Sequence, residues 1–168
     1  LLVTGGSLGA KRINDCIAEA KSVFQENGIQ VLHILGQRSD MNATRDGDYV
    51  RLTYCDRMDL AMAVADFAVS RAGAATVSEL AAMGLPAVLV PYAVGNGEQR
   101  LNAESLVSAG GAILVLDKDF NLDFVKNQLL PILKDQNRIS AMKVAAKLLG
   151  ITDGASKLVK LINASVKR

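Results

Sequence analysis

The stretch Leu1-Leu2-Val3-Thr4-Gly5-Gly6-Ser7-Leu8-Gly9-Ala10 decides the fold of this chain. Residues 1–4 are apolar enough for a buried strand, and residues 10–27 carry apolar side chains at helical spacing until Gly28. The glycines between them let the backbone approach a phosphate, and the helix N-terminus offers free N–H groups to an anion. A lone glycine-rich turn is a weak signal, and a tight turn with Ser7 as N-cap explains the same residues.

Strand and helix patterns alternate along the rest of the chain. Strands are expected at residues 31–35, 50–54, 67–70, 87–90 and 112–116. Helices are expected at residues 58–65, 76–83 and 98–109 and from about residue 121 onward, with loops at residues 38–48 and 91–97. Because the strands are apolar throughout, the sequence predicts an α/β domain over residues 1–168, a doubly wound parallel sheet covered on both faces.

The composition excludes several classes of protein. The chain has 168 residues, of which 50% are hydrophobic, and its net charge of +2 gives no nucleic-acid footprint. The two cysteines, Cys16 and Cys55, do not have metal-site spacing, so a reducing cytosol is expected rather than a disulfide scaffold. The single histidine, His33, lies in an apolar strand and is predicted to be a hydrogen-bonded structural residue. The opening strand, without an initiator Met or a signal peptide, leads us to expect a piece of a longer protein.

Two further loops follow predicted strands, where ligands of doubly wound sheets bind. In Ser70-Arg71-Ala72-Gly73-Ala74-Ala75-Thr76-Val77-Ser78-Glu79, the backbone N–H groups near Ala74 are suited to an anion. The Glu79 carboxylate is suited to ribose hydroxyls, or alternatively to a capping box with Thr76. After strand 87–90, Glu98 and Gln99 are either sugar ligands or ordinary first-turn helix residues. Asp46-Gly47-Asp48 has a metal-like spacing, but it precedes a strand and predicts a plain glycine turn.

Taken in order, segments 5–10, 54–58 and 70–79 and residues Gln99, Asn102 and Ala103 resemble one family. It is the family of peptidoglycan glycosyltransferases that form lipid II, within the GT-B superfamily, and the resemblance is to their C-terminal half. It extends along nearly the whole chain, to Asp153-Gly154-Ala155. Such enzymes transfer N-acetylglucosamine from UDP to undecaprenyl-pyrophosphoryl-muramoyl-pentapeptide, in a cleft between two Rossmann-like domains.

The resemblance implies that this chain is the donor domain, which binds UDP-N-acetylglucosamine. By this resemblance, Tyr54 and Cys55 contact the uracil, and Gly6, Ser7, Ala75 and Thr76 contact the diphosphate. Glu79 contacts the ribose, and Ala74, Glu98 and Gln99 contact the sugar. Arg71 contacts its own loop. The family pattern commonly has Gln at the positions of Leu8 and Ile34, and His or Gln at that of Glu98.

The resemblance also implies what the rest of the enzyme supplies. The acceptor-binding N-terminal domain lies outside this chain, so no catalytic residue is expected here, and neither a metal nor a cofactor is implied. The complete enzyme is expected to invert the anomeric carbon by direct displacement, as a peripheral protein on the cytoplasmic face of the bacterial membrane.

Two other functions remain open from the residues alone, and the residues count against a third. The chain could be the donor domain of another GT-B glycosyltransferase, for example one that makes glycolipids or natural products. It could be a non-catalytic interaction module. A dinucleotide-binding oxidoreductase domain would carry an acidic residue at the end of the second strand, near Leu35 and Gly36, and this sequence has none there.

Overall fold

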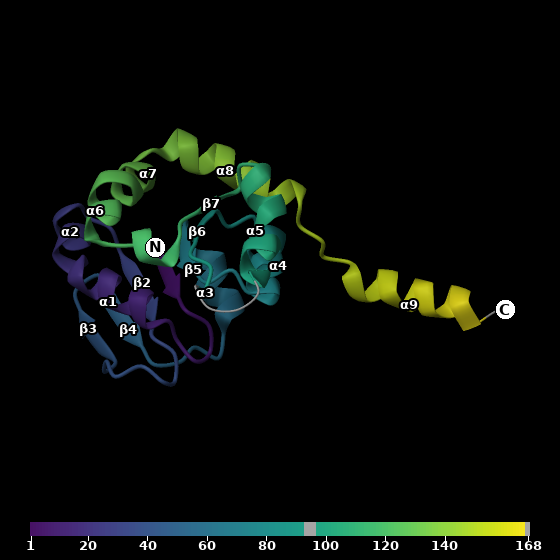
Figure 1. The fold of residues 1–168 in the computed structure, drawn as a ribbon, viewed down its shortest axis with the longest axis horizontal. Coiled ribbons are helices and arrows are strands. Elements are labelled where there is room, and N and C mark those ends of the chain that lie inside the picture. Colours follow the sequence, from purple (N-terminus) through teal and green to yellow (C-terminus); the bar gives the residue numbers. More distant parts are fainter. Residues whose placement is uncertain (93–96, 167–168) are drawn as a thin grey trace.

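The computed structural model describes residues 1–92 and 97–166, and within them a seven-stranded sheet lies between two layers of helices (Figure 1). The strands are β1 Leu2–Thr4, β2 Val31–Ile34, β3 Thr44–Asp46, β4 Tyr49–Leu52, β5 Ala68–Ser70, β6 Ala87–Leu89 and β7 Ala112–Leu114. Their order in the sheet is β3-β4-β2-β1-β5-β6-β7, and every neighbouring pair is parallel except β3 and β4. The predicted doubly wound sheet is therefore confirmed, with one antiparallel strand added at its edge.

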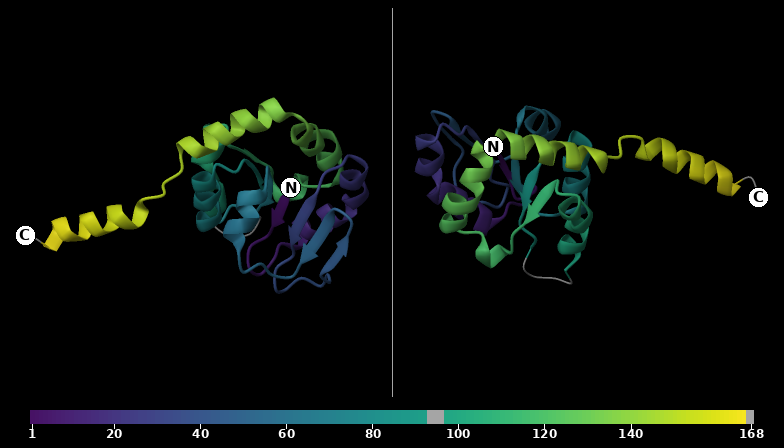
Figure 2. Two further views of the ribbon diagram at one scale, coloured as in Figure 1. Left: turned by 180° about the vertical axis from the view of Figure 1, so that it is seen from behind. Right: turned by 90° about the horizontal axis from the view of Figure 1, so that it is seen from above.

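The helices cover both faces of this sheet (Figure 2). They are α1 Lys11–Glu19, α2 Lys21–Glu26, α3 Met58–Val64, α4 Ala74–Met83, α5 Glu98–Ser108, α6 Leu122–Phe124, α7 Leu130–Lys134, α8 Gln136–Leu148 and α9 Gly154–Val166, with short 3-10 and π segments at Asp117–Asp119 and Val125–Leu129. Helices α1, α2, α6 and α7 share one core cluster, and α3, α4 and α5 share the other. Helix α8 joins the two layers, because Ile139 lies in the first cluster and Ala146 in the second.

Burial on both faces explains why inner strands such as β1, β5 and β6 show no polar alternation. Adjacent residues of a strand point to opposite faces, so Leu2 packs in one cluster and Val3 in the other. Ala68 and Val69 divide in the same way on β5. A sheet with one wet face would show a polar residue at every second position instead.

The prediction of a loop at residues 38–48 was wrong for its last part. Residues Thr44–Asp46 form β3, which is exposed along its length and pairs only with β4 among the described strands. Gly47, at φ +56°, makes the turn between them, so the predicted glycine turn is confirmed. The strand was missed because a polar edge strand has no hydrophobic pattern, and its pairing comes from the hairpin with β4.

The predicted helix over residues 10–27 is two helices, α1 and α2, that meet at Ala20. The backbone of Ala20 leaves helical geometry at φ −80° and ψ 5°, and its side chain is fully buried. Both helices contribute to the same core cluster, through Ile17 and Phe24. The break changes the direction of the chain, but the apolar residues on both sides of it pack into the same core cluster. The spacing of apolar residues therefore did not reveal the break.

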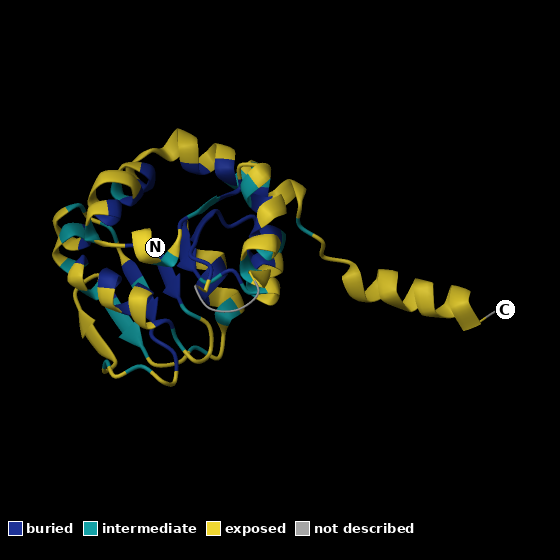
Figure 3. Ribbon diagram, viewed as in Figure 1, coloured by how far each residue is buried: buried dark blue, intermediate teal, exposed yellow. Residues whose placement is uncertain are grey.

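Helix α9 projects away from the rest of the molecule (Figure 1). None of its described residues is buried (Figure 3). Its exposed apolar residues include Leu161 and Ile162. Across residues 1–92 and 97–166, no helix is long and apolar enough to cross a bilayer. Residues 93–96, within the predicted loop 91–97, lie outside the described residues.

His33 is the structural residue that the sequence predicted. It is fully buried on β2, with Nδ1 2.9 Å from the Tyr49 hydroxyl and Nε2 3.1 Å from Asn14 Oδ1. The Asn14 amide nitrogen donates to the Leu35 carbonyl, so Asn14 Oδ1 faces His33 as a hydrogen-bond acceptor. His33 Nε2 must therefore carry the proton of that hydrogen bond. Because burial keeps the ring neutral, Nδ1 carries no proton and accepts a hydrogen bond from the Tyr49 hydroxyl. Burial, with a smaller contribution from Arg51, lowers the pKa of His33 to about 4.

Stability is expected to fall between pH 7 and pH 5 because of His33. The unfolded chain binds a proton at His33 near pH 6.5 and the folded chain only near pH 4, so the contribution is complete above pH 6.5 and is lost as the pH falls. At pH 5 the loss should be about 2 kcal/mol. Urea unfolding of the wild type and of His33→Gln at both pH values measures it. An equally steep pH dependence in the variant would contradict this assignment.

Candidate functional site

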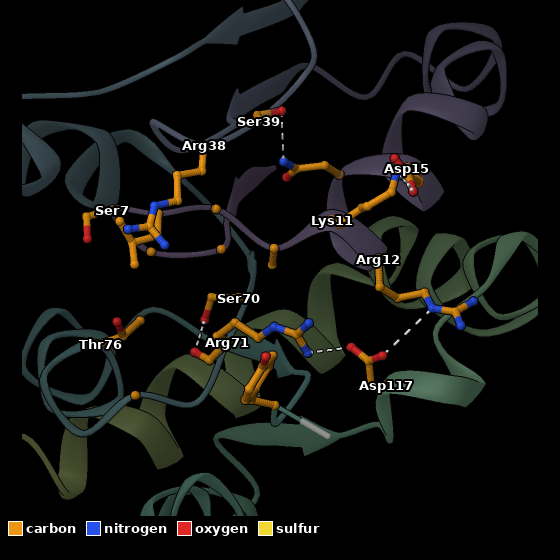
Figure 4. Close-up of a pocket in the computed structure, with 18 of the residues that line it drawn as sticks. Ser7, Lys11, Arg12, Asp15, Arg38, Ser39, Ser70, Arg71, Thr76 and Asp117 are labelled. Atoms are coloured by element: carbon orange, nitrogen blue, oxygen red, sulfur yellow. Dashed lines mark hydrogen bonds and ion pairs between the residues drawn. The ribbon is translucent and has the colours of Figure 1, made fainter. Parts of the chain in front are cut away.

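A cleft of about 850 Å³ lies at the carboxyl ends of the parallel strands (Figure 4). It opens where β1 and β5 lie side by side in the middle of the sheet. The chain winds outward in opposite directions from these two strands, which is the position where open α/β sheets bind ligands. The described lining comes from residues 5–12, 14–15, 38–41, 70–71, 73, 76, 92, 99 and 117.

The glycine-rich loop after β1 forms one wall of the cleft. It is held against the loop after β2, because the N–H of Gln37 donates to the Ser7 carbonyl at 2.9 Å. Gly9 and Gly36 meet at this contact, both with positive φ, and a Cβ on Gly36 would lie 2.1 Å from the Gly9 nitrogen. Only two glycines allow the two backbones to pack this closely.

Helix α1 follows the glycine-rich loop, and no described side chain accepts a hydrogen bond from its first N–H groups. Its N-cap is Ala10, and no side chain hydrogen bond caps it, so the capping role considered for Ser7 was wrong. Ser7 is exposed and lies in the cleft lining. The free N–H groups and the positive end of the α1 dipole thus lie next to the cleft, where an anion is favoured.

Helix α4 presents a second uncapped N-terminus to the same cleft. Its N-cap is Gly73, again without a side-chain hydrogen bond, and Gly73 and Thr76 both line the cleft. The helix begins at Ala74, two residues before the predicted start. Thr76 is therefore its third residue and Glu79 its sixth, so the capping box considered for this pair was wrong. Glu79 is exposed on α4 and has no capping role.

Gln99 and Asn102 attach α5 to the loop after β5. The Gln99 side-chain oxygen accepts the N–H groups of Tyr92, at 2.9 Å, and Ala72, at 3.3 Å. The Asn102 amide donates to the Ala72 carbonyl at 3.1 Å. These bonds place the start of α5 beside the start of α4, at the edge of the cleft.

Arg71 holds three strand ends together. Its guanidinium donates to the Val90 and Pro91 carbonyls at 3.1 Å each and to Asp117 Oδ1 at 2.5 Å. Only 12% of the Arg71 side chain and 18% of the Asp117 side chain are exposed. Arg12 of α1 lies 3.8 Å from the other Asp117 oxygen, so the carboxylate links the two walls of the cleft.

The structure brings together some of the predicted site residues and not others. Those that line the cleft are Gly6, Ser7, Arg71, Thr76 and Gln99. Those that lie outside its lining are Tyr54, Cys55, Ala74, Ala75, Glu79 and Glu98. Tyr54 and Cys55 follow β4, so they lie at the same edge of the sheet as the cleft but two strands away from β1.

Sequence reasoning missed six of the charged residues that line the cleft, and Arg12, Arg38 and Asp117 are among them. Asp117 comes shortly after β7, and Arg38 comes shortly after β2. Residues that follow parallel strands gather at one edge of the sheet, so this rule could have identified both. It could not have identified Arg12, which reaches Asp117 from the first turn of α1.

Comparison with known proteins agrees with this geometry. Residues 1–158 match the glycosyltransferase family 28 C-terminal domain. A UDP-N-acetylglucosamine–N-acetylmuramyl-(pentapeptide) pyrophosphoryl-undecaprenol N-acetylglucosamine transferase from Leifsonia xyli is 52% identical over 99% of this chain and 46% of its own length. A Thermobifida fusca protein of the same name is 46% identical over 98% of this chain and 44% of its own length.

Solved structures show the same relationship. The crystal structure of Acinetobacter baumannii MurG superimposes with a TM-score of 0.81 at 28% identity, covering 97% of this chain and 49% of that one. The calicheamicin glycosyltransferase CalG4 has a TM-score of 0.70 at 17% identity, with 95% and 41% covered, and shares the fold. The chain spans about half the length of the relatives that it matches.

Proposed function

Because the chain belongs to the glycosyltransferase family 28 C-terminal domain family, we propose that it is the donor-binding half of a glycosyltransferase that uses UDP-N-acetylglucosamine. The observation that carries the proposal is the pair of uncapped helix N-termini, α1 and α4, at one cleft. A nucleoside diphosphate places two phosphates together, and each helix end offers N–H groups and a positive dipole to one of them. An anion bound there would satisfy donors that no side chain caps.

The complete protein is proposed to transfer N-acetylglucosamine to a lipid-linked muramyl-pentapeptide, the reaction that its relatives' names state. The acceptor hydroxyl attacks the anomeric carbon, the bond from that carbon to the diphosphate oxygen breaks, and UDP leaves with inversion. The dipoles of α1 and α4 stabilise the charge that develops on the leaving diphosphate. The acceptor site, the general base and peripheral attachment to the inner membrane face are assigned to the part of the protein outside this chain.

The donor contacts remain predictions at the level of single residues. We propose that the diphosphate lies between Ser7 and Thr76, which line the cleft on the loops after β1 and β5. The ribose is assigned to Glu79 and the uracil to the backbone at Tyr54 and Cys55. For Gln99, the hydrogen bonds from Tyr92 and Ala72 leave its amide nitrogen as the group assigned to the sugar.

A calorimetric titration of the 168-residue chain tests the proposal. UDP and UDP-N-acetylglucosamine should bind, UDP-galactose should bind more weakly than UDP-N-acetylglucosamine, and NAD should not bind. Preference for another nucleotide sugar would favour the donor domain of a different glycosyltransferase. If no uridine nucleotide binds to the folded chain, the donor-domain function is wrong.

Glu79→Ala should weaken the binding of UDP by about 1–3 kcal/mol, the range for losing hydrogen bonds to a charged group. The unfolding midpoint should not change, since Glu79 is exposed and caps no helix. Glu104→Ala, an exposed carboxylate on α5 outside the cleft lining, is the matched control and should change neither quantity. A loss of stability with unchanged affinity would contradict the assignment of Glu79 to the ribose.

A further inference from the structure

The charges in the cleft are unequally matched. Four cationic side chains belong to its described lining: Lys11, Arg12, Arg38 and Arg71. Lys11 pairs with Asp15 at 2.9 Å, and Arg12 and Arg71 share Asp117. Within the described lining, Arg38 is the cationic side chain that has neither an ion pair nor a side-chain hydrogen bond. Its charge is thus available to a ligand.

Arg38 is also fixed in position relative to the glycine-rich loop. Its own N–H donates to the Leu8 carbonyl at 3.3 Å, next to the bond from Gln37 to Ser7. The tight packing of Gly9 against Gly36 holds the two loops together just before this point. Figure 4 shows the Arg38 side chain extending from its loop toward the segment that carries Ser7. The guanidinium therefore lies on the wall to which the diphosphate is assigned.

We infer that Arg38 is a diphosphate-binding residue of the donor site, supplied by the loop after β2. A guanidinium presents N–H groups in a fork that matches two phosphate oxygens, and its charge offsets that of the diphosphate. The helix N-termini contribute only partial charges, whereas Arg38 adds a full positive charge from a side chain that forms no ion pair within the described lining. The inference rests on the proposed function, and it adds a third loop to the two that were assigned to the phosphates.

The test is a comparison of Arg38→Gln with the wild type, with UDP titrated by calorimetry and uridine by NMR. Arg38→Gln should weaken UDP binding about 10-fold or more and leave uridine binding within about 2-fold, because uridine lacks the phosphates. The affinity of the wild type for UDP should also fall more steeply with salt than that of the variant. Arg38→Lys, which keeps the charge and loses the fork, should lie between the two.

Arg45→Gln is the matched control, since it removes the same charge from exposed strand β3, outside the cleft lining. It should bind UDP within about 2-fold of the wild type. Both variants should keep the wild-type unfolding midpoint, because neither side chain makes a hydrogen bond or ion pair within the described structure. Unchanged UDP binding in Arg38→Gln, or an equal loss for uridine, would overturn the role of Arg38 and leave the proposed function standing. Failure of the wild type to bind UDP would overturn both.

Discussion

Gly36→Ala is expected to destabilise the fold by about 3–5 kcal/mol. The added Cβ would lie 2.1 Å from the Gly9 nitrogen and 2.3 Å from Gly9 Cα, at a backbone φ of +87°. These are backbone atoms of the glycine-rich loop, so no side chain can move aside to relieve the contact. The loop would have to separate from the loop after β2, and UDP binding should weaken together with stability. Urea unfolding and a UDP titration measure the two effects.

Gly47→Ala is the matched control for this prediction. Gly47 also has a positive φ, +56°, but a Cβ there has no heavy atom within 4 Å. Its cost should therefore be that of the backbone conformation alone, about 1 kcal/mol, with UDP binding unchanged. Similar costs at the two positions would mean that the contact between the two loops contributes nothing to stability.

Arg71→Ala is expected to lower the free energy of unfolding by about 2–4 kcal/mol. The change leaves Asp117, which is mostly buried, with only the more distant Arg12, and it removes the donor to the Val90 and Pro91 carbonyls. The ends of β5, β6 and β7 then lose the side chain that joins them. Because the loop after β5 leads into α4, UDP binding should weaken as well. Urea unfolding and calorimetry of the variant test both expectations.

Two further variants separate this ion pair from a general effect of charge. Arg57→Ala removes an arginine that pairs with Asp59 on the surface at 2.7 Å, and it should give no measurable change in stability. The double variant Arg71→Ala with Asp117→Ala should be less destabilised than the two single changes predict when added, because no unpaired carboxylate remains. Strict additivity would show that Arg71 and Asp117 act independently.

Sequence reasoning identified the features that the local chemistry of the residues is sufficient to determine. Gly28, Gly84 and Gly110 end helices or turns with positive φ where the pattern placed the stops. Apolar runs bounded by such stops predicted six strands, and their lack of polar alternation predicted burial on both faces. His33 could be recognised as structural because an ionisable ring inside an apolar strand needs hydrogen-bond partners.

Other features depended on contacts that are distant in sequence. β3 is a strand because it pairs with β4, and α1 and α2 meet at Ala20, a fully buried residue whose backbone is not helical. Helix α4 starts at Ala74 rather than Thr76, which removed the capping box and moved Glu79 to the sixth position of the helix. None of these outcomes follows from local propensity, since each is decided by what packs or pairs against the segment.

The sequence by itself determined the alternation of strand and helix, and the glycine and small-residue loops that allow backbone to face a phosphate. Only the tertiary structure decided which side chains meet in the cleft. Arg38 and Asp117 lie far apart in the chain, and they line one cleft because β2 and β7 run parallel and end at the same edge of the sheet. Local chemistry selects turns and buried runs residue by residue. The position of a charge in the cleft depends instead on strand order and direction, which the packing of the whole sheet sets.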